Sequence, residues 1–382
     1  MEFSIAKGDF LRGLQKTQGV ADTRGAIPIL SNILIEADTS KKGIWIYATD
    51  LKIGIKGFYK AEVKGEGKFT INARKVFDIV KELPEEDILI KIEDRVGEGG
   101  EEGVQLSGMW VTLSCGNYKT RLSGLPVDEF PAFPSYGKSY LVKFEPLQLK
   151  EMIKKTLFSI SSDETRYALN GTLLEAEGNI VKMVSTDGHR LSYIRRENPK
   201  KVEKNLNVII PQKTTVELLK LIEDGEEDVL FSIYENHVVF KKDDFILVSR
   251  VIDGQFPNYE AVIPKNNDRR VVIDKETFNH ALKRVSLLSD EKSRMVKLKI
   301  EKNHMELISD TVGIGEAREG IDVNYKGDEL NIGLNARYML DVIATVDSDK
   351  VFLDLKDSIS PSILMPSNDE NYKCVIMPMR LQ

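Results

Sequence analysis

The side chains best suited to chemistry lie in the segment STDGHRLS at residues 185–192, where Asp187 and His189 stand two residues apart. A carboxylate beside an imidazole is a pair that general acid–base catalysis uses. Such a pair also needs a nucleophile or a bound substrate in the right geometry, which the motif does not supply. Asp187-Gly188 is at the same time a strong hairpin-turn signal. A hydrolase that uses Asp187 and His189 is therefore kept only as an alternative to a structural turn.

Other enzyme and metal signatures are missing from the sequence. There is no G-x-x-x-x-G-K-[ST], no complete G-x-G-x-x-G, no H-E-x-x-H and no G-x-S-x-G. The four histidines lack metal-ligand spacing, and Cys115 and Cys374 lie far apart in predicted strands. We therefore expect no catalysis, no cofactor, no metal and no disulfide, but two buried, reduced thiols.

Length and composition describe a folded chain of several domains. The 382 residues are 41% hydrophobic and 30% charged, which suggests two or three domains of about 150 residues each. No apolar run approaches the roughly 18 residues of a membrane span. The first residues, MEFSIAKGDFLRGL, carry charges too early for a signal peptide. We expect a cytoplasmic protein with no membrane contact.

The sequence contains three copies of one pattern. FSIAKGDFLRGLQK, YLVKFEPLQLKEMIKK and RVVIDKETFNHALKR each read as an alternating strand followed by a helix with one apolar face. A second helix follows in each copy and opens with Asn or Pro near its start, as a cap would. A Ser/Thr-Asp pair at 49–50, 186–187 and 309–310 falls between β-rich runs, where we expect the same turn three times.

The repeat predicts an α+β fold of three similar domains, 1–138, 139–264 and 265–382, each with antiparallel sheets and two helices. The helices are expected at 7–20, 73–83, 146–161, 211–223, 275–290 and 335–346. The acidic, Gly-rich stretch at 96–104 predicts a loop tip between two strands. Copies of one unit related head to tail close a ring if the rotation per unit closes.

The charge is distributed unevenly. The net charge is −6, yet the six predicted helices sum to about +6, which leaves about −12 for the remainder. Basic helices with an acidic remainder fit a ring that accepts DNA inside and repels it outside. A modest positive charge also suits sliding, because many tight phosphate contacts would bind strongly and weaken steeply with salt. The alternative is that Lys and Arg simply favour helices.

The chain resembles, over its whole length, the bacterial β subunit of the replicative DNA polymerase, the sliding clamp family. The resemblance is carried by IPILSNILIEA, ATDLKIGIKG, LPVDEFP, RYALNG, STDGHRL and the terminal MPMRL, in that order. It implies a head-to-tail homodimer that encircles double-stranded DNA without reading its sequence, with helices inside and sheets outside. It also implies a clamp loader that opens the ring. The replicative polymerase and repair polymerases would dock through short linear peptides.

The resemblance implies a peptide-binding groove between the second and third domains. Two Met and a Pro near the last residue suit an adaptable binding surface, the alternative being a frayed tail. The implied groove residues are Arg166, Leu169, Thr186, Gly188, His189, Arg190, Leu191, Pro257, Val262, Tyr338, Val375, Met377, Pro378, Met379 and Arg380.

The resemblance also implies contacts with DNA and between two copies of the chain. The DNA contacts are Arg24, Lys81 and Tyr167, beside the helix lysines Lys150 and Lys154. The dimer contact would join Thr120 and Leu122 to Leu287 and Leu288.

Five positions depart from the family pattern: Thr120 stands in place of an aromatic residue, Ala168 in place of a second Tyr after Tyr167, Ala261 in place of Arg and Pro361 in place of Ser, and Gln382 follows the usual terminal Leu. Thr120 leaves the strength of the dimer contact open, and the other four leave the peptide preference open. Besides the hydrolase, a triplicated β-rich adaptor that binds proteins but not DNA stays an alternative. Such an adaptor would have the groove without being retained on circular DNA.

Overall fold

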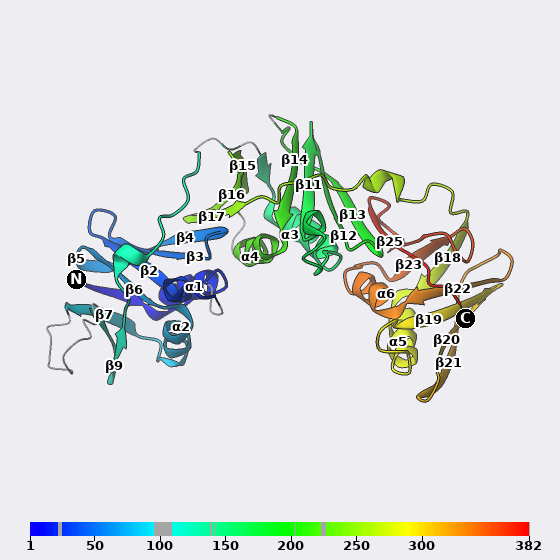
Figure 1. The fold of residues 1–382 in the computed structure, drawn as a ribbon, viewed down its shortest axis with the longest axis horizontal. Coiled ribbons are helices and arrows are strands. Elements are labelled where there is room, and N and C mark those ends of the chain that lie inside the picture. Colours follow the sequence, from blue (N-terminus) through cyan, green and yellow to red (C-terminus); the bar gives the residue numbers. More distant parts are fainter. Residues whose placement is uncertain are drawn as a thin grey trace. The chain divides into compact units, whose positions relative to one another are not determined.

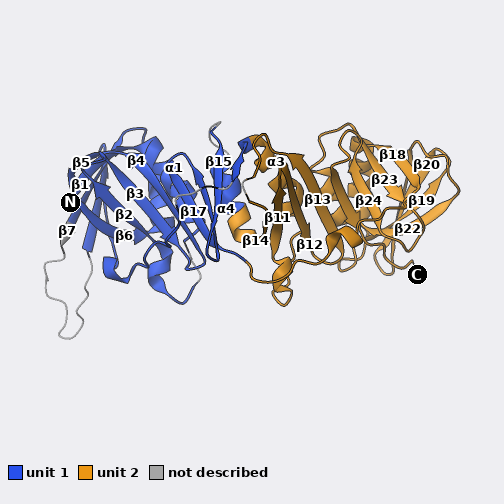
Figure 2. Ribbon diagram, turned by 90° about the horizontal axis from the view of Figure 1, so that it is seen from above, with its two compact units in different colours: residues 1–146, 216–251 blue, residues 147–215, 252–382 orange. Residues whose placement is uncertain are grey.

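The computed structural model describes residues 1–21, 25–94, 109–137, 140, 142–202, 204–222 and 227–381. The chain divides into two compact units, shown in Figure 2: residues 1–146 with 216–251 form unit 1, and residues 147–215 with 252–382 form unit 2. Each unit holds one eight-stranded sheet and one smaller sheet, and the recorded strand pairs are all antiparallel.

Unit 1 contains a five-stranded sheet in the order β5-β1-β7-β8-β9 and an eight-stranded sheet in the order β10-β15-β16-β17-β4-β3-β2-β6 (Figure 1). The smaller sheet consists of β5 (Glu62–Gly65), β1 (Glu2–Ala6), β7 (Asp87–Asp94), β8 (Met109–Cys115) and β9 (Tyr118–Ser123). The larger consists of β10 (Val142–Phe144), β15 (Val229–Tyr234), β16 (His237–Lys242), β17 (Phe245–Arg250), β4 (Ile53–Lys60), β3 (Gly43–Thr49), β2 (Asn32–Asp38) and β6 (Gly67–Asn72).

Unit 2 contains an eight-stranded sheet in the order β14-β11-β12-β13-β25-β24-β23-β18 and a four-stranded sheet in the order β21-β20-β19-β22. The larger consists of β14 (Leu206–Pro211), β11 (Gly171–Glu177), β12 (Ile180–Thr186), β13 (Arg190–Glu197), β25 (Tyr372–Ile376), β24 (Ser362–Pro366), β23 (Lys350–Leu355) and β18 (Arg269–Asp274). The smaller consists of β21 (Gly315–Asp322), β20 (His304–Thr311), β19 (Met295–Glu301) and β22 (Leu330–Asn335).

Six helices occur in the described ranges, one at each predicted place: α1 (Lys7–Gln18), α2 (Ala73–Glu82), α3 (Pro146–Leu157), α4 (Gln212–Ile222), α5 (Lys275–Ser286) and α6 (Ala336–Ile343). The predicted Asn caps are confirmed for two of them. The Asn72 side chain accepts from Lys75 N at 3.0 Å, and the Asn335 side chain accepts from Tyr338 N at 3.2 Å. The α+β fold class with two helices in each repeat is therefore confirmed.

Each repeat contributes two sets of strands. The strand before its first helix and those after its second helix form an outer set, and the strands between the helices form an inner set, except β5, which pairs with β1. In unit 1, the inner set of the first repeat joins the outer set of the second through β4 and β17. In unit 2, the inner set of the second repeat joins the outer set of the third through β13 and β25. The domain boundaries 1–138, 139–264 and 265–382 stay predictions.

The repeated Thr-Asp turn is present in two of the three copies. In the first, the Asp50 carboxylate accepts from Lys52 N and Ile53 N at 2.9 and 2.8 Å, while Thr49 Oγ1 donates to Ile53 O at 2.9 Å. The second copy, around Asp187, has the same four-residue geometry.

The expectation of a third such turn was wrong. Ser309 and Asp310 lie inside β20, where they pair with Ala317 and Glu316, and the chain turns only after Thr311. The β20–β21 hairpin is longer than its two counterparts. Ser309 and Asp310 are therefore paired with the neighbouring strand and do not form a turn.

Two expectations about local structure have different outcomes. Both Cys115 and Cys374 are buried free thiols, as predicted, and burial raises the pKa of Cys374 to about 11. The loop tip expected at 96–104 lies outside the described residues. Over the described part of the chain, every helix is too short or too polar to cross a membrane.

Candidate functional site

Unit 2 contains an apolar cavity of about 120 Å³ where the second and third repeats meet. We call it the anchor cavity. Every lining residue except Tyr259 belongs to the groove set that the resemblance implied. The lining residues are Leu169, Thr186, Gly188, Arg190, Leu191, Pro257, Tyr259, Val262, Val375 and Met377.

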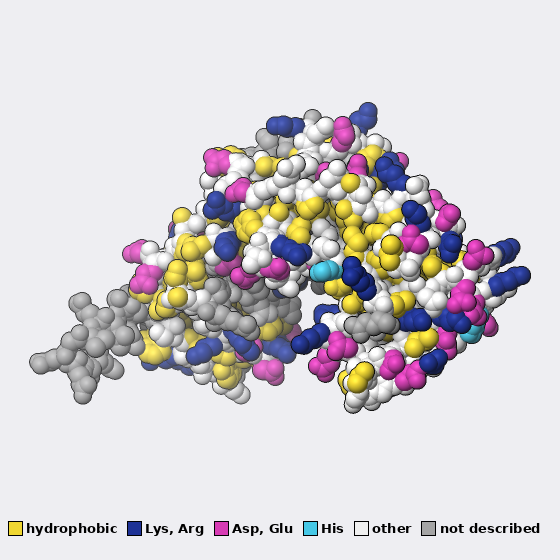
Figure 3. All heavy atoms as spheres, turned by 45° about the vertical axis from the view of Figure 1, so that its right-hand side comes forward, with side chains coloured by type: hydrophobic (Ala, Val, Ile, Leu, Met, Phe, Trp, Pro, Cys, Tyr) yellow, Lys and Arg dark blue, Asp and Glu magenta, His cyan; other side chains and the backbone are white. Residues whose placement is uncertain are grey.

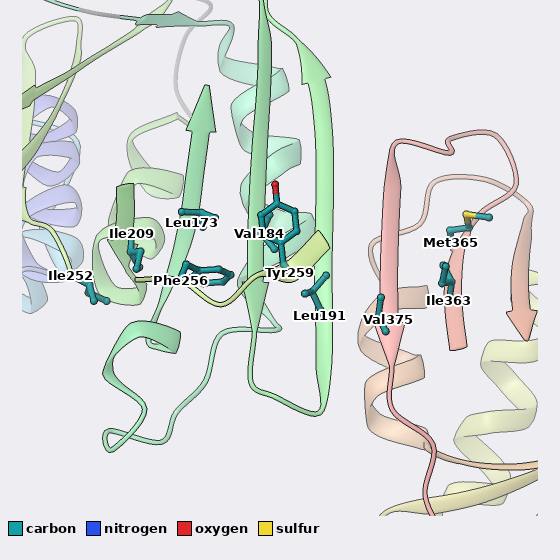
Figure 4. Packing of buried hydrophobic residues seen from close by; sticks show 10 residues of the cluster. All are labelled: Leu173, Val184, Leu191, Ile209, Ile252, Phe256, Tyr259, Ile363, Met365 and Val375. Carbon is teal, nitrogen blue, oxygen red and sulfur yellow. The ribbon is translucent and has the colours of Figure 1, made fainter. Parts of the chain in front are cut away.

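The floor of the anchor cavity is the seam between β13 and β25, where Leu191 lies opposite Val375. Both side chains are buried, at 3% and 0% exposure, and they continue into a hydrophobic cluster that the 252–259 segment covers. Figure 4 shows this cluster, with Phe256 and Tyr259 lying over strands β11 to β13 and Val375 on the neighbouring β25. Because the floor is part of the core, the cavity keeps its shape without a ligand.

The rim at 186–190 is fixed by the repeated turn. The Asp187 carboxylate accepts from the backbone N–H groups of His189 and Arg190, both at 2.9 Å, and from Arg190 Nε at 3.1 Å. Gly188 has φ +87°, a backbone conformation that favours glycine, and a Cβ there would come within 2.5 Å of Arg166 Nη1 and displace that side chain. Asp187 is thus occupied by its own turn. The described residues contain no side-chain hydrogen bond between Asp187 and His189, and the acid–base reading loses its geometric basis.

Arg190 lines the cavity, but its charge is already neutralised. Its guanidinium pairs with Asp341 at 2.6 Å and with Asp187 at 3.1 Å, and it donates to Phe158 O. It also lies over the Tyr338 ring at 4.4 Å. Arg190 is therefore a fixed part of the cavity wall, packed against the Tyr338 ring, and not a free charge.

Tyr259 is a lining residue that sequence reasoning missed. Its hydroxyl donates to Glu175 Oε2 at 2.5 Å and accepts from Lys182 Nζ at 3.4 Å, and its ring packs 5.9 Å from the Tyr193 ring. Burial and the hydrogen bond to Glu175 raise the pKa of Tyr259 well above its usual value. These contacts hold the 257–262 segment, and with it Pro257 and Val262, against β11 and β12. No local pattern marks such a residue, since its partners are about 80 positions away.

The last residues are tied down rather than frayed. Met377 N donates to His189 O at 2.9 Å, and Met379 N donates to Gly333 O at 2.8 Å. A Cβ on Gly333 would meet Met379 O and Leu381 Cδ2 at 3.0 Å, so glycine allows the segment to approach β22 closely. The frayed-tail alternative is wrong.

The other implied groove residues surround the anchor cavity without lining it. Arg166 Nη1 donates to Asp187 O at 3.1 Å behind the turn, while His189 and Arg380 are exposed. Pro378 and Met379 are half-buried. Their assignment to peptide binding, like that of the lining residues, stays a prediction.

Some helix lysines are buried, and others lie at the surface. Lys7, Lys16 and Lys155 are buried: Lys7 reaches Glu85 at 2.8 Å, Lys16 lies 4.1 Å above the Phe245 ring, and Lys155 reaches Glu151 at 2.6 Å. Counting them as charges that could meet DNA was therefore wrong, because the charged group of a helical lysine can be paired or packed inside the fold.

The lysines predicted to contact DNA lie at the surface. Lys81 in unit 1 and Lys150 and Lys154 in unit 2 are exposed or half-exposed and make no ion pair within the described ranges. Tyr167 is 57% exposed, and Arg24 lies outside the described residues. On the face shown in Figure 3, positive and negative side chains are interspersed, so that face carries no continuous field of one sign.

The predicted dimer residues lie at sheet edges. Thr120 and Leu122 belong to β9, the edge of the five-stranded sheet, and both are half-buried on the side of Leu113 and Val111. In unit 2, Leu287 follows α5 and is 80% exposed. Leu288 O accepts from Thr311 Oγ1 at 2.8 Å, which ties this corner to the hairpin that ends in the edge strand β21.

A search of the described residues finds no group of three His, Cys, Asp or Glu side chains placed to hold a metal ion. Structural roles account for the acidic side chains of the site, since Asp187, Asp341 and Glu175 each pair with a neighbour.

Comparison with known proteins gives one consistent result. Three family models match in succession: the DNA polymerase III beta subunit N-terminal domain at residues 1–134, its central domain at 143–258 and its C-terminal domain at 260–380. The chain is 33% identical over 383 residues to the beta sliding clamp of Pseudomonas putida and 31% identical over 382 residues to that of Escherichia coli K12, each covering 100% of both chains.

Solved structures agree. A DNA polymerase III beta subunit from Thermotoga maritima superposes with a TM-score of 0.91 at 26% identity, covering 100% of both chains. A sliding clamp from Pseudomonas aeruginosa, solved with griselimycin bound, gives 0.90 at 30% identity and 100% coverage of both chains. The C. crescentus clamp, solved with PEG bound to a putative beta-motif tethering region, gives 0.90 at 33% identity, covering 100% of this chain and 99% of that one. The chain therefore belongs to the family of DNA polymerase III beta subunits, the beta sliding clamps, which are processivity factors and not catalytic subunits.

Proposed function

We propose that two copies of the chain close head to tail into a ring around duplex DNA, and that the anchor cavity tethers polymerases to it. One observation carries the ring. Each repeat's inner set can join the outer set of the next repeat, and two such junctions, β4 with β17 and β13 with β25, are made within the chain. The third would join β21 to β9, and within the described residues both are unpaired sheet edges.

A junction between β21 of one copy and β9 of another satisfies both edges. An unpaired edge strand exposes a row of N–H and C=O groups and readily pairs with another chain. Each copy has one β9 edge and one β21 edge. Two identical contacts between two copies therefore close a dimer in which every β9 and β21 edge is paired. Around the β21 hairpin, Leu287, Val312 and Ile314 are 80, 100 and 56% exposed, which is apolar surface suited to such a contact.

The register of this contact follows from the junctions within the chain. Tyr118 follows the β8–β9 hairpin as Phe245 follows the β16–β17 hairpin, so Thr120 takes the place of Leu247. Leu247 lies opposite Ile55 of β4, which pairs with Ala48 of β3. Counted from the preceding hairpin, Ala48 corresponds to Ser309 of β20, whose partner in β21 is Ala317. We therefore expect Thr120 of one copy to lie opposite Ala317 of the other.

This register can be tested by cross-linking. A variant with Thr120→Cys and Ala317→Cys should form a covalent dimer under mild oxidation or with a short bis-maleimide, because directly opposed Cβ atoms lie about 4.5–5.5 Å apart. The native Cys115 and Cys374 are buried and contribute little background. Each single variant is the control. A monomeric native mass at micromolar concentration, with no cross-link in the double variant, would contradict the ring.

Within the ring, retention on DNA would come from topology and mobility from weak contacts. Lys81, Lys150 and Lys154 offer unpaired charge, and Arg24 and Tyr167 complete the proposed DNA contacts. A few exposed cations give weak, salt-sensitive phosphate contacts that shift easily. This role places the protein in the cytoplasm, with a clamp loader as the partner that opens it.

The anchor cavity supports peptide docking through its size and lining. An apolar space of about 120 Å³ takes one large apolar side chain, and Met377 at its edge can adapt to different ones. The groove residues that surround it would hold the rest of a short linear peptide, whose affinity would depend on one or two anchor side chains.

A further inference from the structure

A second cavity of about 340 Å³ adjoins the anchor cavity and shares Val262 and Met377 with it. We call it the flanking cavity. A peptide that fills the anchor cavity can reach the flanking cavity by passing Val262 and Met377, which border both. Ala261 and Pro361, two of the positions that leave the peptide preference open, both line it.

The charge of the flanking cavity has one sign. Its charged lining residues are Lys265 and Lys356, both exposed, and neither takes part in an ion pair among the described residues. No Asp or Glu lines it. The neighbouring Asp357 does not line the cavity: its carboxylate accepts from Ile359 N at 2.9 Å and from Ser360 N at 2.6 Å, and Lys356 contributes only the smallest of the effects that lower its pKa.

The walls of the flanking cavity are held together. Asn267 Nδ2 donates to Asp354 O at 2.9 Å and to Pro361 O at 3.0 Å, which links the 264–267 segment to the turn before β24. The two lysines project from these linked segments, Lys265 from the first and Lys356 from the end of β23. A carboxylate in the cavity would therefore meet two cations whose backbones do not have to move.

We propose that the flanking cavity binds carboxylates of the docked peptide, so that this clamp prefers partner peptides whose apolar anchor is flanked by Asp or Glu. The inference rests on the proposed peptide-binding role of the anchor cavity and adds the partner's chemistry to it. Ala261 and Pro361 bring no charged side chain to the cavity, so its preference for a charged group comes from the two lysines.

The test compares synthetic fluorescein-labelled peptides with a Leu-Phe anchor that carry Glu-Glu or Gln-Gln on the N-terminal or the C-terminal side. Binding to the full-length protein is measured by fluorescence anisotropy at low and high salt. At one end, the Glu peptide should bind about three- to tenfold more tightly than its Gln partner, as two exposed ion pairs allow. The ratio should fall towards one at high salt.

Matched variants assign the effect to the cavity. Lys265→Gln with Lys356→Gln should remove the advantage of Glu while leaving the affinity for the Gln peptides unchanged. Lys326→Gln, at an exposed lysine elsewhere in unit 2, should leave the advantage intact. Equal melting temperatures of the variants show that folding is preserved.

The outcomes separate the two proposals. If the Gln peptides bind and Glu brings no advantage at either end, the flanking cavity has no such preference and the anchor cavity stands. If the advantage survives in the double lysine variant, its source lies elsewhere and the inference is wrong. If no peptide binds even at high protein concentration, the anchor cavity itself is not a peptide site and both proposals fall.

Discussion

At the scale of single residues, Tyr259 holds one wall of the anchor cavity through contacts to three neighbours. Its hydroxyl bonds Glu175 and Lys182, and its ring packs on Tyr193. Glu175 and Lys182 are each about three-quarters shielded, at 25 and 28% side-chain exposure. The wall therefore depends on a polar network that water reaches only in part.

Removing only the Tyr259 hydroxyl should weaken peptide binding more than folding. Tyr259→Phe keeps the ring but leaves Glu175 and Lys182 short of a partner, at a cost of about 1–2 kcal/mol in unfolding free energy. The looser 257–262 segment should reduce peptide affinity several-fold, measured by anisotropy. Tyr118→Phe, at an exposed tyrosine of β9, is the control. Unchanged affinity in Tyr259→Phe would show that the hydroxyl does not position the wall.

Glu151 links α3 to β13 and to the turn before β25. It pairs with Arg196 at 2.6 Å, and Arg196 also pairs with Asp369 at 2.6 Å. Burial alone would raise the pKa of Glu151, but the hydrogen bonds from Arg196 and Lys155 outweigh it and lower the pKa to about 2. A carboxylate with a lowered folded-state pKa stabilises the fold fully above its unfolded value, near 4.5, and loses that contribution as the pH falls towards 2.

Glu151→Gln should therefore destabilise the protein at neutral pH, by about 1–3 kcal/mol, because Arg196 and Lys155 lose an anionic partner. The difference from the wild type should shrink between pH 4.5 and pH 2, followed by urea unfolding at each pH. Glu291→Gln, at an exposed glutamate after α5, should show no such trend. A difference that stays constant down to pH 2 would contradict the role given to the Glu151 charge.

Residue roles could be predicted from the sequence only where a motif carried them. The lining residues Thr186, Gly188 and Leu191 belong to a recognisable segment. Tyr259 does not, since its role arises from partners that the fold brings from β11 and β12. Similarly, the sequence gives no sign that Lys155 is buried while Lys154 is exposed, because adjacent helix positions differ in what they face.

At the scale of elements, the terminal segment after β25 completes the anchor cavity by lying against β22. Its attachment at Gly333 is close enough that a Cβ would press on Met379 O. Backbone cannot yield as the end of a flexible side chain can, so the segment itself has to move when this glycine is replaced.

Gly333→Ala should therefore displace the segment by a few tenths of an ångström and weaken peptide binding, because Met377 and Met379 shift with it. Hydrogen exchange at Met379 N should become faster, because its bond to Gly333 O is weakened. Deleting residues 377–382 should abolish binding while the rest of the protein stays folded. Gly8→Ala, at a helical glycine with open space around its Cβ, is the control and should be neutral or slightly stabilising. Wild-type affinity in Gly333→Ala would remove the segment from the site.

The elements themselves were predictable because each relies on local signals. Asn72 and Asn335 mark two helix starts, and Thr49 and Thr186 mark two turns. The same signal failed at Ser309, where the pairing of β20 with β21 continues past the expected turn. A turn motif does not form a turn where strand pairing continues through it. How far the pairing continues depends on the partner strand, which the motif does not contain.

At the scale of the whole molecule, three similar repeats give two junctions inside the chain and one that needs a second chain. The sequence shows the repeats, but not that β4 pairs with β17 and β13 with β25. These pairings join residues about 190 positions apart, for which no short-range pattern exists. The structure thus adds the observation on which the ring depends, namely that β9 and β21 have no partner strand on one side within the described residues, while their counterparts in the other repeats are paired.

The most direct measurement compares how long the protein is retained on circular DNA, which has no ends, and on linear DNA. The protein is loaded onto nicked circular DNA by a clamp loader with ATP and separated from free protein by gel filtration at moderate salt. A ring that encircles DNA stays with the circle and is lost after a single restriction cut, because it slides off the ends. If the protein leaves circular and linear DNA at the same rate, it is held by contacts and not by topology, and the proposed ring is wrong.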